Sequence, residues 1–376
     1  MSNLPARKLR AGILGATGTV GQRFISLLES HPLFVVHTLG ASARSAGQTY
    51  GQVVRWKVNV PFTSVVGDLV VQPCEPDRFR DCDVIFSGLD SSVAGEIETA
   101  FLKADLAVLS NAKNHRMAPD VPLIVPTANP EHLAVVQHQR ARHSLKRGFL
   151  VTNANCSTTG LVVVLRALQD AFGPMSHVIV QTMQAVSGAG YPGVSSLDIL
   201  DNVVPLIDGE EEKMESEVAK ILGSVLPDQS GFQHLENTVV SATCNRVAVI
   251  DGHTECVSVK FARSAVAADG SQLPPPSVAE VRRVLAEYTS EAQLLQCVSA
   301  PKHPITVADR PDRPQPRLDR DTHGGNSVTV GRIRPCPVLD LKFTLLVHNT
   351  VLGAAGSSIL NAELAVAKGV LKPLDD

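Results

Sequence analysis

The sequence predicts an α/β protein in which an N-terminal Rossmann-like domain, built on a doubly wound parallel sheet, precedes an α+β domain with a mixed or antiparallel sheet. Three observations lead to this prediction. Short apolar runs alternate with helical spacings over the first 155 residues, which is typical of buried parallel strands joined by helices. A glycine-rich loop follows the first run. After Cys156 the apolar stretches become longer, with helical segments between them.

Seven apolar runs account for the strands of the first domain. They lie at residues 9–14, 34–39, 69–71, 84–86, 106–109, 123–125 and 149–151. Between the first two runs, Val20, Phe24, Leu27 and Leu28 recur at the spacing of one helix face. Strand, helix and strand in this order predict a parallel sheet that is covered by helices.

The second domain is predicted from β-like stretches at residues 177–184, 238–250, 253–261 and 339–347. An apolar helical stripe lies between them and consists of Met214, Val218, Ile221 and Leu222. Helical spacing resumes at residues 359–367, and we expect this tail to pack back on the first domain.

Composition excludes several classes of protein. The 376 residues carry a net charge of −3 and 4 % aromatic residues, so we expect no nucleic-acid partner. No apolar run reaches the ~18 residues of a membrane helix, and the first residues lack the apolar core of a secretory signal. Seven scattered cysteines without a Cys-x-x-Cys pair favour free thiols in the cytoplasm and no metal site.

The glycine-rich loop reads Gly15-Ala-Thr-Gly18-Thr-Val-Gly21 and stands between the first strand and its helix. Glycines allow the backbone to approach a pyrophosphate, and the helix start offers free N–H groups to the anion. This arrangement predicts a dinucleotide site.

The end of the second strand indicates which dinucleotide binds. NAD enzymes usually carry an Asp or Glu there for the ribose hydroxyls, but no carboxylate occurs between Glu29 and Asp68. Arg44 stands there instead, flanked by Ser42 and Ser45. A guanidinium and two hydroxyls suit a 2′-phosphate, so NADP is preferred to NAD.

Cys156 follows a predicted strand and opens a predicted helix, in the order Asn155-Cys156-Ser157-Thr158. The positive end of a helix dipole lowers the pKa of a thiol, so we expect a reactive thiolate. A thiolate beside a nicotinamide indicates aldehyde chemistry through a thioester. From these residues alone the acceptor of the acyl group stays open between water, phosphate and a coenzyme thiol.

Arg246 and His253 flank an Asp-Gly pair, which predicts a hairpin that turns at Asp251-Gly252. In such a hairpin both side chains share one face and lie about 13 Å apart along the strand, at 3.3 Å per residue. His253 suits general acid/base work, and Arg246 suits a substrate carboxylate. Glu210 and Lys213 share one helix face, which on spacing alone favours a solvated salt bridge.

Taken together, these motifs resemble the aspartate-semialdehyde dehydrogenase family, especially its fungal and archaeal branch. The resemblance runs from about residue 9 to 368 and also includes Gln184-Ala-Val-Ser-Gly-Ala-Gly190 and Asn349-Thr-Val-Leu-Gly-Ala-Ala-Gly356. Leu352 departs from the family pattern, which has Arg at that position. The resemblance implies reductive dephosphorylation of 4-phospho-L-aspartate with NADPH, giving L-aspartate 4-semialdehyde and phosphate, on the route to lysine, threonine, methionine and isoleucine.

The resemblance also implies roles for individual residues. The catalytic residues would be Cys156 as acyl carrier, His253 as acid/base and Gln184 as an orienting group. The substrate and phosphate would be bound by Arg116, Asn155, Glu210, Lys213 and Arg246. NADP would be bound by Gly15, Thr17, Gly18, Thr19, Val20, Ser42, Arg44, Ser45, Ser87, Ser187, Gly188 and Asn349.

The expected organisation follows from the same resemblance. Residues 1–155, completed by a C-terminal helix at 349–376, would bind NADP, and residues 156–348 would provide catalysis and dimerisation. The chain would form a homodimer or homotetramer. Two alternatives are another acyl-phosphate or acyl-coenzyme A reductase of this architecture and a non-enzymatic NADP-sensing regulator, although a regulator would leave Cys156, His253 and Arg246 unexplained.

Overall fold

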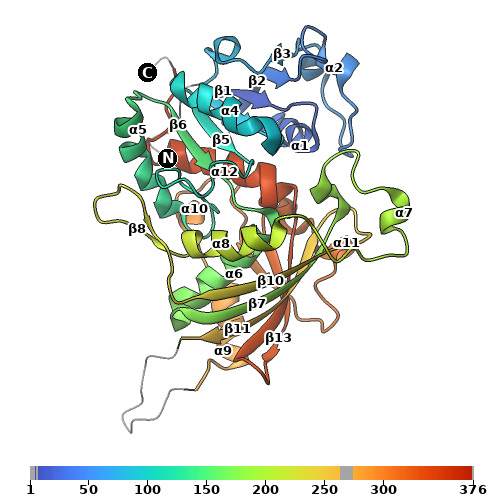
Figure 1. The fold of residues 1–376 in the computed structure, drawn as a ribbon, viewed down its shortest axis with the longest axis vertical. Helices are drawn as coiled ribbons and strands as arrows, with labels where there is room; N and C mark the ends of the chain where they lie inside the picture. The colour runs from blue at the N-terminus through green and yellow to red at the C-terminus, as the bar shows by residue number, and fades with distance from the viewer. Residues whose placement is uncertain (1–4, 6, 263–273, 375–376) are drawn as a thin grey trace.

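The computed structural model describes residues 5, 7–262 and 274–374 and contains two six-stranded sheets, one above the other in Figure 1. The first sheet is parallel, with strand order β3-β2-β1-β4-β5-β6. Its strands are β1 (Leu9–Leu14), β2 (Phe34–Ala41), β3 (Gln72–Pro73), β4 (Val84–Ser87), β5 (Ala107–Ser110) and β6 (Phe149–Thr152). The predicted Rossmann-like parallel sheet is therefore confirmed.

Helices cover this first sheet. They are α1 (Thr19–Leu28), α4 (Ser91–Lys103), α5 (Val136–His143) and the C-terminal α12 (Gly356–Ala367). Ile359, Ala362 and Val366 of α12 belong to the same apolar cluster as Phe24 and Phe86. The tail of the chain thus returns to the first sheet, as the red helix beneath the blue strands in Figure 1 shows.

The second sheet is mixed, with strand order β10-β7-β11-β14-β13-β12. β10 is parallel to β7, whereas β11 is antiparallel to both β7 and β14. The strands are β7 (Met175–Gln184), β10 (Val239–Arg246), β11 (His253–Phe261), β12 (Ile305–Val307), β13 (Val328–Pro335) and β14 (Leu341–Val347). Helices α6 (Cys156–Phe172), α8 (Glu210–Ile221) and α9 (Val278–Glu287) pack against it.

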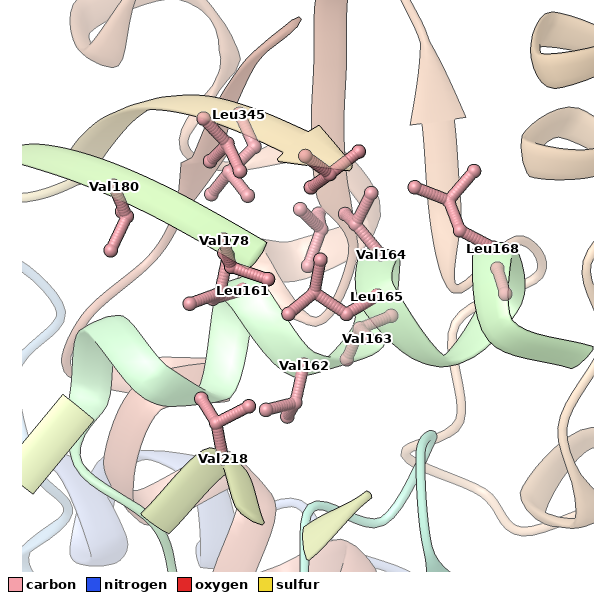
Figure 2. Packing of buried hydrophobic residues seen from close by; sticks show 14 of the residues in the cluster. Leu161, Val162, Val163, Val164, Leu165, Leu168, Val178, Val180, Val218 and Leu345 are labelled. Carbon is pink, nitrogen blue, oxygen red and sulfur yellow. The ribbon is translucent and has the colours of Figure 1, made fainter. Parts of the chain in front are cut away.

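Helix α6 is the centre of the second core. Figure 2 shows Leu161 and Leu165 pointing toward Val178 and the strands, while Val162 points toward Val218 of α8. A helix that is enclosed on several sides is apolar nearly all round, and each buried Leu or Val contributes roughly 1.5–3 kcal/mol. This packing fixes the first turn of α6, where Cys156 lies.

Shorter elements connect these layers. They are α2 (Tyr50–Val53), α3 (Ser64–Gly67), η1 (Pro76–Phe79), η2 (Pro130–Val135), η3 (Val186–Ala189), α7 (Ser196–Ile199), β8 (Ser224–Val225), β9 (Phe232–Gln233), α10 (Glu291–Leu294), α11 (Pro316–Asp319), η4 (Thr322–Gly325) and the π-helical turn η5 (Val351–Ala355). Leu352 in η5 is fully buried in the core around α6, so an apolar residue suits this position.

Three expectations about the strands are wrong. The run 123–125 forms a single bridge, Leu123 to Thr152, because prolines at 122 and 126 bound it. The run 69–71 precedes the strand, which is the two-residue edge β3. The predicted hairpin does not exist, because β7 lies between β10 and β11 and the β10 strand ends at Arg246.

The described residues contain no helix that is long and apolar enough to cross a bilayer. Within the same residues, no group of three or more His, Cys, Asp or Glu side chains is placed to hold a metal ion.

Candidate functional site

A cavity of about 590 Å³ opens where the carboxyl ends of the parallel strands meet the second sheet. Its wall is formed by residues that follow successive strands: Gly15 after β1, Ser42 after β2, Gly88 after β4, Arg116 after β5 and Cys156 after β6. Ligands of open α/β sheets bind outside these strand ends. The loop from Ser187 to Tyr191 closes the cavity on the other side.

The glycine-rich loop fits a dinucleotide. Gly15 has a φ of +71°, and a Cβ there would lie 2.7 Å from the Gly88 carbonyl oxygen. Gly18 occupies the N-cap of α1 without a capping side chain, so the first N–H groups of the helix face an anion site. The cavity wall includes Thr17, Gly18, Thr19 and Val20.

The other residues expected at the cofactor, Ser87 apart, fall into two groups. Ser42, Ser187, Gly188 and Asn349 line the cavity, and Asn349 Nδ2 donates to Ser187 Oγ at 2.8 Å. Arg44 and Ser45 lie outside its wall, in the turn that follows Ser42, where Arg44 is exposed.

Ser87 is not at the cavity. Its side chain is fully buried and its hydroxyl donates to Glu98 Oε1 at 2.6 Å, because Ser87 is the last residue of β4 and points into the helix layer. The next residue, Gly88, reaches the cavity in its place.

Cys156 and His253 meet in the structure. Cys156 Sγ and His253 Nε2 are 3.2 Å apart, although the two residues stand 97 positions apart in the chain. The Ala185 N–H donates to His253 Nδ1 at 3.0 Å. Because Nδ1 accepts this bond, we assign the proton of the neutral imidazole to Nε2, facing the sulfur.

The expected low thiol pKa is wrong for this structure. Burial and then the charge of Glu210 raise the pKa of Cys156 to about 12, and the Arg116 and Arg246 charges and the Ser157 N–H oppose this only in part. Burial also lowers the pKa of His253 to about 3, assisted by Arg246. The helix N-terminus is present, but desolvation of the sulfur outweighs it.

Gln184 and Arg246 stand beside His253 on the inner face of the second sheet. Arg246 pairs with Gln184 across β10 and β7, and Arg246 Nη1 donates to the Ala185 carbonyl at 2.8 Å. Gly188 lies directly over this row, since a Cβ there would be 2.9 Å from Arg246 Nη1 and 3.3 Å from His253 Cε1. Gly188 thus leaves space where any side chain would collide.

The Glu210–Lys213 turn is not a solvated surface. Glu210 is 8 % exposed; its Oε1 accepts from Lys213 Nζ at 2.6 Å and its Oε2 from Asn155 Nδ2 at 2.7 Å. Burial alone would raise the pKa of the Glu210 carboxyl. The Lys213 charge and the hydrogen bonds from Lys213, Asn155 and Gln184 outweigh burial, so the pKa of Glu210 is lowered. Glu210 therefore remains ionised near the sulfur.

Arg116 provides a cation at the cavity wall. Its Nη1 donates to Glu217 Oε1 at 2.8 Å and its Nη2 donates to the Asn111 carbonyl at 2.8 Å. Its Nε is buried without a partner among the described residues. A guanidinium carries five donor hydrogens, so this fork retains donors for an anion in the cavity.

Two charged residues of α8 that the sequence did not single out, Glu217 and Lys220, are buried beside the site. Glu217 contacts Arg116 and the backbone of Asn155, and Lys220 Nζ donates to three backbone carbonyls. The sequence does carry a pattern that could have identified them: four charged residues recur at helical spacing beside the apolar stripe, namely Glu210, Lys213, Glu217 and Lys220.

Comparison with known proteins agrees with this geometry. Residues 10–136 match the semialdehyde dehydrogenase NAD binding domain, and residues 165–352 match the semialdehyde dehydrogenase dimerisation domain. An aspartate-semialdehyde dehydrogenase of Cryptococcus neoformans is 60 % identical over 372 residues, which cover 98 % of this chain and 100 % of the relative. One from Methanothermobacter thermautotrophicus is 45 % identical over 358 residues, 95 % of this chain and 98 % of that protein.

A crystal structure of aspartate-semialdehyde dehydrogenase with NADP from Candida albicans is also similar. It has a TM-score of 0.89 and 50 % identity, and the match covers 97 % of this chain and 100 % of that chain. Fold, motifs and full-length identity to fungal and archaeal enzymes therefore agree: the chain belongs to the aspartate-semialdehyde dehydrogenase family.

Proposed function

We propose that this chain catalyses the reversible, NADPH-dependent reductive dephosphorylation of 4-phospho-L-aspartate to L-aspartate 4-semialdehyde and phosphate. The observation that carries the proposal is the 3.2 Å contact between Cys156 Sγ and His253 Nε2 at the end of a cavity that begins at a dinucleotide-binding loop. The reaction belongs to the synthesis of lysine, threonine, methionine and isoleucine.

NADP(H) would lie along the cavity from the glycine-rich loop to Gly188. The first-turn N–H groups of α1 would bind its pyrophosphate, and the 2′-phosphate would be held by Ser42, Arg44 and Ser45 after β2. Ser187 and Asn349 would bind the nicotinamide end. When bound, the cofactor exchanges a hydride with the carbonyl carbon of the substrate.

The phosphate group would bind Arg116 and Lys213, whose side chains converge on the cavity beside Cys156. Glu210 would accept the substrate ammonium, Arg246 the α-carboxylate, and Gln184 and Asn155 would orient the acyl group. These charges are fixed before the substrate arrives, so little reorganisation accompanies binding.

The Cys156 thiol would first release its proton to solvent in the open cavity, because Nε2 of His253 already carries a proton. The thiolate would then attack the acyl phosphate, forming the C–S bond of a thioester while the C–O bond to phosphate breaks and phosphate leaves. Reduction of the thioester gives a tetrahedral oxyanion, and Nε2–H of His253 would donate to that oxygen until the thiolate leaves. The Cys156 N–H, which opens α6, would add to this stabilisation, whereas the Ser157 and Thr158 N–H groups are bonded to Asn155 Oδ1. Removing one such donor typically costs about 3 kcal/mol in the barrier.

Ionisation of the thiol is the step that the substrate must assist, because the pKa of Cys156 is raised to about 12. Glu210 contributes to this rise. A substrate ammonium on Glu210 would cancel its charge, and the thiolate would then be favoured by Arg116, Arg246 and the helix N-terminus. Substrate binding would thereby activate the nucleophile.

The chain organisation supports assembly into a homodimer or homotetramer. We propose that residues 1–155, completed by 349–376, form the NADP-binding domain and that residues 156–348 form the catalytic and dimerisation domain, whose sheet has an exposed outer face. That outer face exposes Ile179, Met183 and Val239 and bears a second groove of about 370 Å³. A cytoplasmic location fits the seven cysteines, all of which are free.

NADPH formation from aspartate semialdehyde, with and without inorganic phosphate, tests the proposed reaction. We expect sustained NADPH formation only with phosphate, and loss of turnover with retained NADP binding in Cys156→Ser. Turnover driven by coenzyme A instead of phosphate would favour another acyl reductase. Wild-type-like turnover in Cys156→Ser would refute the thioester mechanism.

A further inference from the structure

Helix α8 carries four charged side chains at helical spacing, Glu210, Lys213, Glu217 and Lys220. In Figure 1 the helix runs between the first sheet above it and strand β10 below it. Glu210 and Lys213 belong to the proposed substrate site. Glu217 and Lys220 are 2 % and 0 % exposed, and nothing in the reaction described above uses them.

Both carboxylate oxygens of Glu217 are engaged. Oε1 accepts from Arg116 Nη1 at 2.8 Å, and Oε2 accepts from the Asn155 N–H at 2.6 Å. Arg116 stands in the loop after β5, and Asn155 stands directly before Cys156 in the loop after β6. One side chain thus joins the loop of the proposed phosphate ligand to the turn that holds the nucleophile.

Lys220 strengthens the same connection one turn later. Its Nζ donates to the backbone carbonyls of Arg116, Ala118 and Val121 at 2.7, 2.8 and 2.9 Å. An ammonium has three donor hydrogens, and all three are used. Lys220 therefore fixes the backbone of the Arg116 loop, whereas Glu217 fixes the direction of the guanidinium.

We propose that Glu217 is a positioning residue that sets the phosphate-binding guanidinium of Arg116 relative to the thiol of Cys156. The inference rests on the proposed function. In an acyl phosphate a single bridging oxygen joins the carbonyl carbon to phosphorus, so the sulfur and the guanidinium must be spaced to engage one substrate together. Misplacement by about 1 Å can reduce a rate roughly 100-fold.

Two possible roles of Glu217, orienting the Arg116 guanidinium and neutralising its charge, predict opposite changes in phosphate binding when the Glu217 carboxylate is removed. Its carboxylate partly neutralises Arg116, so if charge alone mattered, its removal would strengthen phosphate binding. If Glu217 orients the guanidinium, its removal weakens phosphate binding even though the local positive charge increases. The sign of the change in KM for phosphate therefore separates the two roles.

Glu217→Gln is compared with Glu212→Gln, which removes the same charge from an exposed position of α8. In the oxidative direction we expect Glu217→Gln to raise KM for phosphate about 10- to 100-fold, the affinity that one hydrogen bond to a charged group contributes, with KM for NADP unchanged, and the control to match wild type. An unchanged or lowered KM for phosphate overturns the inference. Equal increases in both KM values also overturn it, because they indicate general disruption.

A double variant tests whether Glu217 acts through Arg116. When Arg116→Lys is already present, we expect Glu217→Gln to add less than twofold to KM for phosphate, since residues in one network are non-additive. Full additivity contradicts the inference. If Glu217→Gln does not fold, Glu217→Asp retains the charge with a shorter reach, and a raised KM for phosphate is again required.

The phosphate dependence of the wild type separates a wrong reaction from a wrong role for Glu217. If wild-type NADPH formation does not depend on phosphate, the proposed function is wrong. If wild type depends on phosphate and Glu217→Gln behaves like wild type, only the positioning role of Glu217 is wrong.

Discussion

Cys156 illustrates how the chemistry of one residue depends on neighbours from distant parts of the chain. Its place at the N-terminus of α6 could be predicted from the Asn155-Cys156-Ser157-Thr158 motif, and Asn155 Oδ1 does accept from the Ser157 and Thr158 N–H groups. Its raised pKa could not be predicted, because it depends on burial and on the charge of Glu210, which arrives from α8.

Removal of the Glu210 charge should make the thiol more acidic. We expect Glu210→Gln to lower the pKa of Cys156 from about 12, because a nearby negative charge opposes ionisation of a thiol. The pH dependence of iodoacetamide labelling measures this pKa, and labelling at pH 8 should be faster than in wild type. Glu212→Gln serves as the control, and a slower reaction in Glu210→Gln would contradict this electrostatic account.

At the scale of elements, β11 brings His253 and Glu255 to one inner face of the second sheet. The sequence predicted β11 as a strand, but it did not predict that β7 and β14 would be the neighbouring strands. The short Asp251-Gly252 link predicted a hairpin, whereas β7 inserts between the two strands and places Gln184 between Arg246 and His253. The predicted residues still meet, because all three strands present these side chains to the same face.

Glu255 of β11 is a buried carboxyl with no compensating charge or hydrogen bond among the described residues. It is 0 % exposed, neither oxygen has a hydrogen-bond partner among the described residues, and burial raises its pKa well above 4.5. Because the pKa of Glu255 is raised in the folded state, the contribution of this group to the free energy of unfolding is fully present below pH 4.5. That contribution is lost as the pH rises, because the unfolded chain releases the proton while the folded chain keeps it.

We therefore expect Glu255→Gln to increase the free energy of unfolding more at pH 8 than at pH 5. Urea titrations at the two pH values measure this difference. Gln at this position keeps the volume and removes the ionisable group, so cavity formation does not contribute. An equal effect at both pH values would show that the Glu255 carboxyl does not titrate differently on unfolding.

At the scale of the whole molecule, the parallel sheet and the return of the C-terminal helix could be predicted from apolar patterning, whereas the patterning left open whether the second sheet is mixed or antiparallel. Strands β12 and β13 were not predicted. β12 has only three residues, and β13, which contains Gly, Arg and Pro, shows no clear alternation of apolar and polar residues. The apolar stripe of α8 was predicted, but the burial of Glu217 and Lys220 beside it was not, since charged residues at helical spacing usually indicate a solvated face.

The outer face of the second sheet leads to a prediction about assembly. Ile179 of β7 is 44 % exposed and Val239 of β10 is 61 % exposed, so a second copy of the chain would bury them. We expect light scattering to give a mass of two or four chains for wild type and a lower mass for Ile179→Asp. A wild-type mass of one chain would contradict this assembly.

The proposed mechanism requires Cys156 to carry the acyl group, and a single-turnover experiment tests this directly. Aspartate semialdehyde and NADP are mixed with the enzyme in the absence of phosphate, and NADPH and the mass of the Cys156 peptide are measured. We expect a burst of NADPH no larger than the number of sites, together with an acyl adduct on Cys156. Absence of the burst, or an adduct on another residue, would contradict it.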